Sequence, residues 1–280
     1  MGAHRKGDVH DPLGPVVELD IGRVSNGRRI EGVRDAVAVE EPLEIRIEGR
    51  TLAVVMRTPG EDRELAAGFL LSEGVIRSHR DLFDITTCVP PSGEGQAVDV
   101  ALRRPADFDA EKLSRHVFVS SSCGVCGKTS IDTVMKEHPP LVDDVAVSAK
   151  TIRSLPKTLG AVQANFQRTG GLHACALFTP EGEMIGMRED VGRHNALDKL
   201  TGWALLEKRL PLVRQVVLLS GRASFEMMQK AHVAGLGIVA AIGAPSSLAV
   251  RYARASGQTL IGFLRPRSFN LYASPERITS

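Results

Sequence analysis

The chain has 280 residues, of which 43% are hydrophobic and 24% are charged, so one large domain or two modest ones can bury a self-supporting core. Its formal net charge of +2 argues against bulk attraction to nucleic acid or to a membrane surface. Four cysteines, the lack of a secretion signal and the interruption of the most apolar stretch (residues 233–250) by glycine and proline predict a cytoplasmic protein without structural disulfides or a membrane span.

The first half of the chain is predicted to be rich in β-structure. Residues 1–35 are polar and contain many Gly and Arg residues, which predicts a flexible arm. Beyond them, apolar and charged residues alternate, and Gly49-Arg50 can form the turn of a hairpin. We assign residues 36–145 to this β-rich region, which ends in a Cys-x-x-Cys loop. The strands expected in it cover residues 42–49, 51–57, 84–89 and 97–103.

One helix is expected within this β-rich region. Thr58-Pro-Gly-Glu61 has the pattern of a capping box, in which Thr58 caps the helix, Pro59 takes the first helical position and Glu61 returns to the amide of the cap. The helix should then continue to a stop at Gly74.

From residue 146 to residue 280, strands alternate with helices. This alternation is typical of βαβ units and of a sheet with parallel strand pairs, so the fold class is α/β. The expected strands cover residues 173–178, 184–188, 215–219, 238–242 and 259–264. The expected helices cover residues 149–167, 193–208, 224–235 and 246–255.

The segment most informative about chemistry is 116–130, which contains Cys123-Gly-Val-Cys126. Four interpretations compete for it. Half of a zinc site needs two further ligands, and no other Cys or His shows paired spacing. A thioredoxin-like dithiol fits a strand-to-helix junction, but the usual flanking Trp and internal Pro are absent. A phosphate loop requires a glycine where Ser122 stands.

The fourth interpretation is a persulfide carrier. Such a cysteine must be a nucleophilic thiolate on an open loop, and Lys128, the amides of Gly124 and Gly127 and the start of the following helix would all favour the thiolate. The second cysteine could help to release the sulfur or hold it during transfer. Spacing alone does not choose among the four interpretations.

Five motifs along the chain act as a joint signature. They are Ser121-Ser-Cys-Gly-Val-Cys-Gly127, Thr169-Gly-Gly-Leu-His173, Glu189-Asp-Val-Gly-Arg-His-Asn-Ala-Leu-Asp-Lys199, Ser220-Gly-Arg-Ala-Ser-Phe-Glu-Met-Met228 and Thr259-Leu-Ile-Gly-Phe-Leu-Arg265. In this order and spacing, the chain resembles the formate dehydrogenase accessory sulfurtransferases of the FdhD type over most of its length.

The resemblance implies a sulfur carrier that takes sulfur from a pyridoxal-dependent cysteine desulfurase as a persulfide on Cys123, with Cys126 as the assisting thiol. The acceptor would be the Mo-bis(molybdopterin guanine dinucleotide) cofactor of formate dehydrogenase, and the protein would have no catalytic metal of its own. The resemblance also implies a homodimer and a cytidine deaminase-like C-terminal domain over residues 146–280. The cofactor contacts would be Phe263, Leu264, Arg265, Pro266, Arg267 and Ser268. The alternative is a chaperone that binds this cofactor and delivers it without chemistry.

The residues themselves exclude deaminase chemistry whatever the fold. A zinc deaminase needs His-x-Glu and a later Pro-Cys-x-x-Cys. The corresponding segments here are His173-Ala-Cys175, which has no Glu, and 220–224, which has no Cys.

Several of the same motifs favour an anionic ligand. Arg193 and His194 open a helix directly after a strand, where free backbone amides favour phosphate, and Arg222 follows the next strand. We therefore add Arg193, His194 and Arg222 to the cofactor-binding candidates. The other notable residues of this half are expected to be structural: His173 as a satisfied core histidine, Cys175 as a buried inert thiol and Trp203 as a core side chain.

Overall fold

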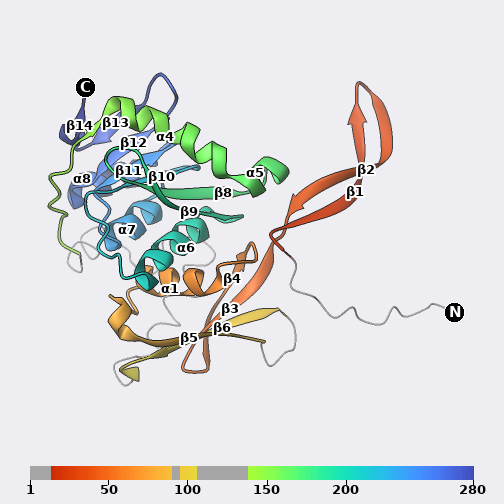
Figure 1. Ribbon diagram of the computed structural model, residues 1–280, viewed down its shortest axis with the longest axis horizontal. Coiled ribbons are helices and arrows are strands. Elements are labelled where there is room, and N and C mark those ends of the chain that lie inside the picture. The colour runs from red at the N-terminus through yellow and green to blue at the C-terminus, as the bar shows by residue number, and fades with distance from the viewer. Residues whose placement is uncertain (1–13, 90–94, 106–137) are drawn as a thin grey trace.

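The structure, a computed structural model, describes residues 14–89, 95–105 and 138–280, so Cys123 and Cys126 lie outside the described residues. Its C-terminal part is built on a six-stranded mixed sheet with the strand order β13-β12-β11-β10-β8-β9 (Figure 1). Strands β10, β11 and β12 are parallel, whereas β8, β9 and β13 run antiparallel to their neighbours. The bounds are β8 (His173–Phe178), β9 (Met184–Asp190), β10 (Val216–Leu219), β11 (Ile238–Ala241), β12 (Thr259–Gly262) and β13 (Asn270–Ala273).

Helices cover both faces of this sheet. One face packs against α6 (Arg193–Leu206), α7 (Phe225–Val233) and α8 (Ser247–Ser256), and the other packs against α4 (Ala149–Val162). Every residue of β10, β11 and β12 is buried, which explains why these strands are short, nearly uninterrupted apolar runs. The expected α/β alternation is thus confirmed.

The N-terminal part contains a second, four-stranded sheet with the order β4-β3-β6-β5. Helix α1 (Asp62–Ser72) lies between this sheet and α6, as Figure 1 shows. The contact between α1 and α6 is close because it is lined by glycines: a Cβ atom at Gly68 or at Gly202 would lie 1.8 Å from a backbone oxygen of the opposite helix. The strand bounds are β3 (Glu41–Ile47), β4 (Arg50–Arg57), β5 (Leu82–Cys88) and β6 (Gln96–Leu102).

Much of the described part of the arm expected over residues 1–35 is regular β-structure. Strands β1 (Val16–Ser25) and β2 (Arg28–Ala38) form an antiparallel hairpin that projects from the body of the molecule (Figure 1). Val17 pairs with Val37 and Ile21 with Val33, so one face of the ribbon is apolar despite the many charged residues around it.

Two further features of the C-terminal part are a divided helix and a short strand pair. The helix expected over residues 149–167 is divided at Gln163 into α4 and α5 (Ala164–Thr169). A short parallel pair joins β7 (Val147–Ser148) to β14 (Ile278–Thr279), which ties the end of the chain to the start of α4. No helix in the described part of the chain is long and apolar enough to cross a membrane.

Candidate functional site

Most of the described candidate residues lie at one edge of the six-stranded sheet. The carboxyl ends of β10, β11 and β12 meet at this edge because the three strands are parallel. Because β8 is antiparallel to β10 and β9 to β8, the start of β8 and the end of β9 reach the same edge. Arg193 and His194 at the start of α6, Arg222 after β10 and the 263–268 segment after β12 are therefore brought to one side of the sheet, where α/β proteins bind ligands.

Backbone hydrogen bonds tie the loops of this edge together. The amide of Gly243 donates to the carbonyl of Gly221 at 2.9 Å, and the amide of Phe263 donates to the carbonyl of Gly243 at 3.0 Å. A Cβ atom at Gly243 would lie 2.7 Å from the oxygen of Gly221, so glycine is required for this approach. The loops after β10, β11 and β12 consequently form one continuous floor.

Four cationic or potentially cationic side chains, His173, Arg193, His194 and Arg222, lie around this floor at its β8 end. A Cβ atom at Gly221 would lie 3.2 Å from Nδ1 of His173 and 3.9 Å from Cβ of Arg193. Burial lowers the pKa of His173, and the nearby charges of Arg193, His194 and Arg222 lower it further. Asp190 opposes this effect, but the cations outweigh it, and such a balance of charge favours an anionic ligand.

Three polar atoms at this edge are buried and form no hydrogen bond within the described residues: Nε of Arg193, Nε2 of His194 and Oγ of Ser224. His194 lies 2.8 Å from the carboxylate of Glu226, through its Nε2 atom. Burial alone would raise the pKa of Glu226, but the contact with His194 and the charges of Lys230 and Arg193 outweigh burial and lower it. Glu226 thus holds His194, whereas Arg193 and Ser224 keep donors available for a ligand.

The 263–268 segment forms a mostly exposed turn beside this floor. The amide of Arg265 donates to the carbonyl of Ser268 at 2.8 Å, and Nη1 of its guanidinium donates to the carbonyl of Ile242 at 2.7 Å. Phe263 is 44% exposed and has a φ of 52°, a left-handed conformation that is uncommon for a bulky residue. Leu264 is buried, so it anchors the turn, whereas Pro266, Arg267 and Ser268 are exposed.

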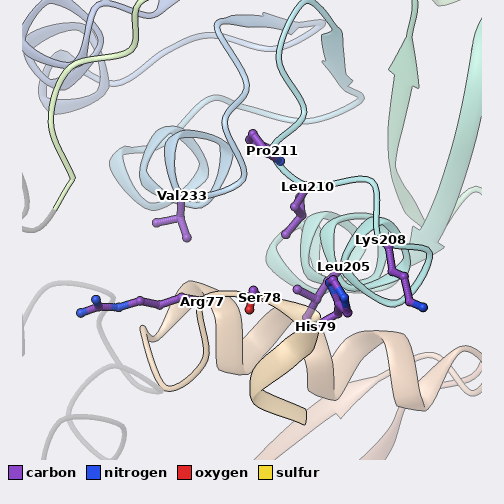
Figure 2. Close-up of a pocket in the computed structure, with 8 residues that line it drawn as sticks. All are labelled: Arg77, Ser78, His79, Leu205, Lys208, Leu210, Pro211 and Val233. Carbon is purple, nitrogen blue, oxygen red and sulfur yellow. The ribbon is translucent and has the colours of Figure 1, made fainter.

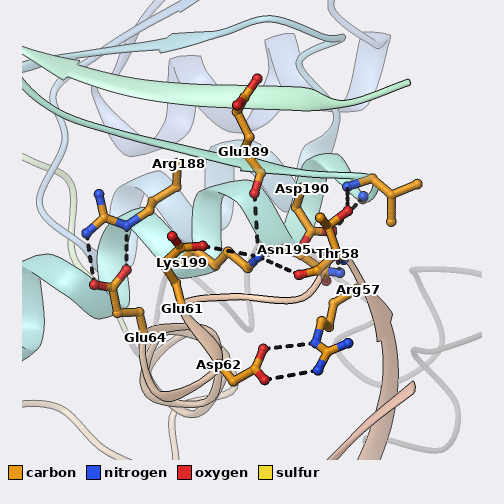
Figure 3. Close-up of polar contacts among 12 residues, drawn as sticks. Arg57, Thr58, Glu61, Asp62, Glu64, Arg188, Glu189, Asp190, Asn195 and Lys199 are labelled. Atoms are coloured by element: carbon orange, nitrogen blue, oxygen red, sulfur yellow. Dashed lines mark hydrogen bonds and ion pairs between the residues drawn. The ribbon is translucent and has the colours of Figure 1, made fainter. Parts of the chain in front are cut away.

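Asp190 organises the beginning of α6 (Figure 3). Its carboxylate accepts hydrogen bonds from the amides of Thr58 and Gly192, from Nδ2 of Asn195 and from Nζ of Lys199, at 2.8–3.1 Å. Asp190 and Lys199 are both fully buried, so this ion pair is shielded from water. The carboxylate fixes the end of β9, the start of α6 and the end of β4 relative to one another.

This network corrects two predictions. Thr58 does not cap α1: its hydroxyl accepts from the amide of Val191 at 3.1 Å, and Glu61, in a left-handed conformation, precedes the helix without a side-chain cap. The amides of Val191 and Gly192 are not free for phosphate, because Thr58 and Asp190 occupy them. Any anion at the start of α6 must therefore be held by side chains and by amides further along the helix.

His173 was expected to be a satisfied core histidine, and that expectation is wrong. Its imidazole is half-buried and surrounded by cations. The imidazole makes no hydrogen bond to another described residue. Reasoning from the sequence missed His173, Ser224 and Glu226 as parts of this edge. Their sequence positions could have indicated this role, because all three lie near strand ends and within motifs that had been noted for other residues.

The expected burial of Cys175 is confirmed. Its side chain is 1% exposed, and burial raises its pKa well above the ordinary range of a thiol, so it stays protonated. Within the described residues, no cluster of three or more His, Cys, Asp or Glu side chains could hold a metal ion.

Fold and edge together define a class: a mixed α/β protein whose cationic sheet edge suits an anionic ligand. A family model described as the FdhD/NarQ family matches residues 38–279. The chain belongs to this family.

Individual relatives agree along nearly the whole chain. The sulfur carrier protein FdhD of Streptomyces coelicolor is 48% identical over 92% of this chain and 97% of its own length. The protein of the same name from Mycobacterium tuberculosis is 48% identical over 88% of this chain and 92% of its own length. The crystal structure of a formate dehydrogenase accessory protein from Desulfotalea psychrophila superposes with a TM-score of 0.74 at 27% identity, covering 94% of this chain and 99% of that one.

Proposed function

We propose that this protein is a sulfur carrier that receives sulfur from a cysteine desulfurase as a persulfide on Cys123 and transfers it to the Mo-bis(molybdopterin guanine dinucleotide) cofactor of formate dehydrogenase. The names of the relatives support the sulfur-carrier role and the link to formate dehydrogenase. The observation that carries the acceptor side is the convergence of His173, Arg193 and Arg222 at one sheet edge.

The acceptor is a substrate with two guanosine diphosphate halves, so it presents several phosphate charges. Arginine forms forked hydrogen bonds with phosphate oxygens, and each charge-assisted bond contributes about 1.5–3 kcal/mol. Nε of Arg193 and Oγ of Ser224 would gain the partners that they lack. Phe263, exposed at the end of β12, offers an aromatic surface for a guanine or pterin ring.

The sulfur chemistry belongs to the two cysteines outside the described residues. In the loading step, the Cys123 thiolate attacks the outer sulfur of the donor's persulfide; an S–S bond forms at Cys123, and the donor cysteine leaves as a thiolate with the electron pair. For release, the Cys126 thiolate attacks Sγ of Cys123, and the outer sulfur departs as hydrosulfide to the acceptor. A Cys123–Cys126 disulfide results, and a dithiol reductant must reduce it before the next cycle.

The experiment that tests this proposal combines mass spectrometry with a complementation assay. Wild-type protein incubated with a cysteine desulfurase and cysteine should gain about 32 Da, one sulfur atom, on the peptide that contains Cys123. Cys123→Ser should abolish both the adduct and the activation of formate dehydrogenase, whereas the matched variant Cys88→Ser should retain both. Full formate dehydrogenase activity with Cys123→Ser would refute sulfur transfer.

That same outcome would favour the second candidate, a chaperone that binds the cofactor without chemistry, which the cationic edge supports equally well. A homodimer, which the resemblance implies, is also part of the proposal. Sedimentation of the purified protein measures it directly.

A further inference from the structure

Two residues that flank residues 106–137 in the chain, Arg103 and Pro139, are held by hydrogen bonds. Before residue 106, Arg103 is fixed through its amide to the carbonyl of Asp81 at 2.9 Å and through Nε to the carbonyl of Leu82 at 3.1 Å. After residue 137, the carbonyl of Pro139 accepts from Nε2 of His232 at 3.0 Å. Arg103 and Pro139, which lie on either side of residues 106–137 in the chain, are therefore each held by hydrogen bonds to other elements.

A cavity of about 230 Å³ lies between residues 77–79 and the ends of α6 and α7 (Figure 2). Its lining includes Ser78 and His79, which lie just before the Asp81 anchor, and Val233, which follows the His232 anchor. It is thus formed by both parts of the molecule: the short 3₁₀ helix of residues 79–81 on one side, and the ends of α6 and α7 on the other. The apolar part of the lining is Leu205, Leu210, Pro211 and Val233.

Cationic side chains surround the cavity. Arg77, His79 and Lys208 line it. Arg80 is exposed next to His79, and the exposed Arg103 and Arg104 lie on the strand end that is bonded to Asp81 and Leu82. Within the described part of the chain, none of these six side chains forms an ion pair with a carboxylate. A concave apolar surface with a cationic rim is complementary to an apolar side chain flanked by acidic residues.

The size of the cavity decides between classes of ligand. Pockets for drug-sized molecules and cofactors have about 300–1,000 Å³, so a volume of about 230 Å³ is too small for a guanine dinucleotide but holds one large side chain. Its position agrees: the cationic sheet edge lies at the start of α6 and the cavity at its end, and a 14-residue helix is about 21 Å long. The cavity is therefore not an extension of the proposed acceptor site.

We propose that this cavity is the docking site for an acidic segment of the sulfur donor, which inserts one apolar side chain between Leu210 and Val233 while its carboxylates face Arg77 and Lys208. The proposal rests on the sulfur-carrier function. It places the donor at the end of α6 opposite to the acceptor, near Asp81 and Leu82, to which Arg103 is bonded.

Lys208 offers a variant that preserves the fold. It terminates α6 with a φ of 59°, and its amide donates to the carbonyl of Leu205 at 3.0 Å. Glycine is the residue that this left-handed position favours, so Lys208→Gly removes the charge while retaining the helix end.

The test measures the rate of persulfide formation on the full chain with a purified pyridoxal-dependent cysteine desulfurase and cysteine as the probe. The variants are Lys208→Gly and the charge-reversed pair Arg77→Glu/Lys208→Glu. The matched control is Lys157→Glu/Arg251→Glu, which makes the same change in charge at exposed positions of α4 and α8. Labelling by inorganic polysulfide, a donor without a protein, reports whether the cysteines themselves remain reactive.

The charge-reversed pair should lose about tenfold or more of the desulfurase-dependent rate at low salt, and this difference should shrink at about 500 mM salt. Lys208→Gly should lose part of the rate, while the control pair and all polysulfide rates stay unchanged. An unchanged desulfurase-dependent rate in the charge-reversed pair would overturn the docking site, as would an equal loss with polysulfide. Failure of the wild type to form any persulfide would instead refute the sulfur-carrier function.

Discussion

The glycine contact between α1 and α6 makes a quantitative prediction. In Gly202→Ala the new methyl group would lie 1.8 Å from the carbonyl oxygen of Glu64 and 2.6 Å from the amide nitrogen of Gly68. Both are backbone atoms, so no side-chain rotation relieves the clash and the two helices must separate. Separation also weakens the buried hydrogen bond from Ser72 to Asp198, which is 2.7 Å long.

The magnitude follows from opposing terms. Overpacking and the weakened buried contact cost about 4 kcal/mol together, and the better helix propensity of alanine returns about 1 kcal/mol. The free energy of unfolding should therefore fall by about 3 kcal/mol, which lowers Tm by about 6–12 °C in a chain of this size.

Thermal and urea unfolding measure this effect, and fluorescence of Trp203 is a suitable probe because it is the only tryptophan and adjoins the substituted position. Gly160→Ala is the matched control, because a Cβ atom at this position in α4 would meet nothing within 4 Å. That control should be neutral or stabilised by about 0.5–1 kcal/mol. If Gly202→Ala were as stable as the control, the inferred closeness of the two helices would be wrong.

Three further predictions concern the site. Lys199→Met leaves the buried Asp190 carboxylate without its cation and should lower the free energy of unfolding by about 3–5 kcal/mol in urea titrations; a loss below about 1 kcal/mol would contradict the buried pair. Because burial and neighbouring cations lower the pKa of His173, a bound anion should raise that pKa again, so binding takes up a proton and affinity for guanosine diphosphate should increase as pH falls from about 7.5 to 6. Calorimetry in buffers of different ionisation enthalpy detects the proton, and His173→Gln should abolish the uptake. Iodoacetamide should leave Cys175 unmodified in the native protein and alkylate it in urea, as peptide mass spectrometry would show; native alkylation would contradict its burial.

The elements that sequence patterns predicted well are those governed by local signals. Continuous apolar runs located β10 and β11 almost to the residue, because strands buried on both faces need no polar residues. The hairpin of β1 and β2 was not predicted, because its charged residues dominate the composition and only the cross-strand register shows that apolar residues share a face.

At the site, the errors come from partners distant in sequence. Thr58 has the local pattern of a helix cap, yet its hydroxyl bonds to Val191, more than a hundred positions away. His173 becomes part of the cationic edge only because antiparallel pairing brings the start of β8 beside Gly221 and Arg193. Trp203, expected in the core, is only partly buried at its edge, and the guanidinium groups of Arg188 and Arg209 lie 5.3 and 5.1 Å from the centroid of its ring.

The length of α6 has a consequence for the order of events. Its first turn belongs to the cationic edge, and its last turn lines the cavity beside residues 77–79. The two ends are about 21 Å apart, which leaves room for a protein at one end and a small cofactor at the other. If the proposed donor and acceptor sites are both correct, donor and cofactor can occupy the carrier at the same time, and a loaded persulfide need not wait in water for the donor to dissociate. Under this geometry the kinetics of sulfur delivery would be those of a ternary complex rather than of two successive encounters.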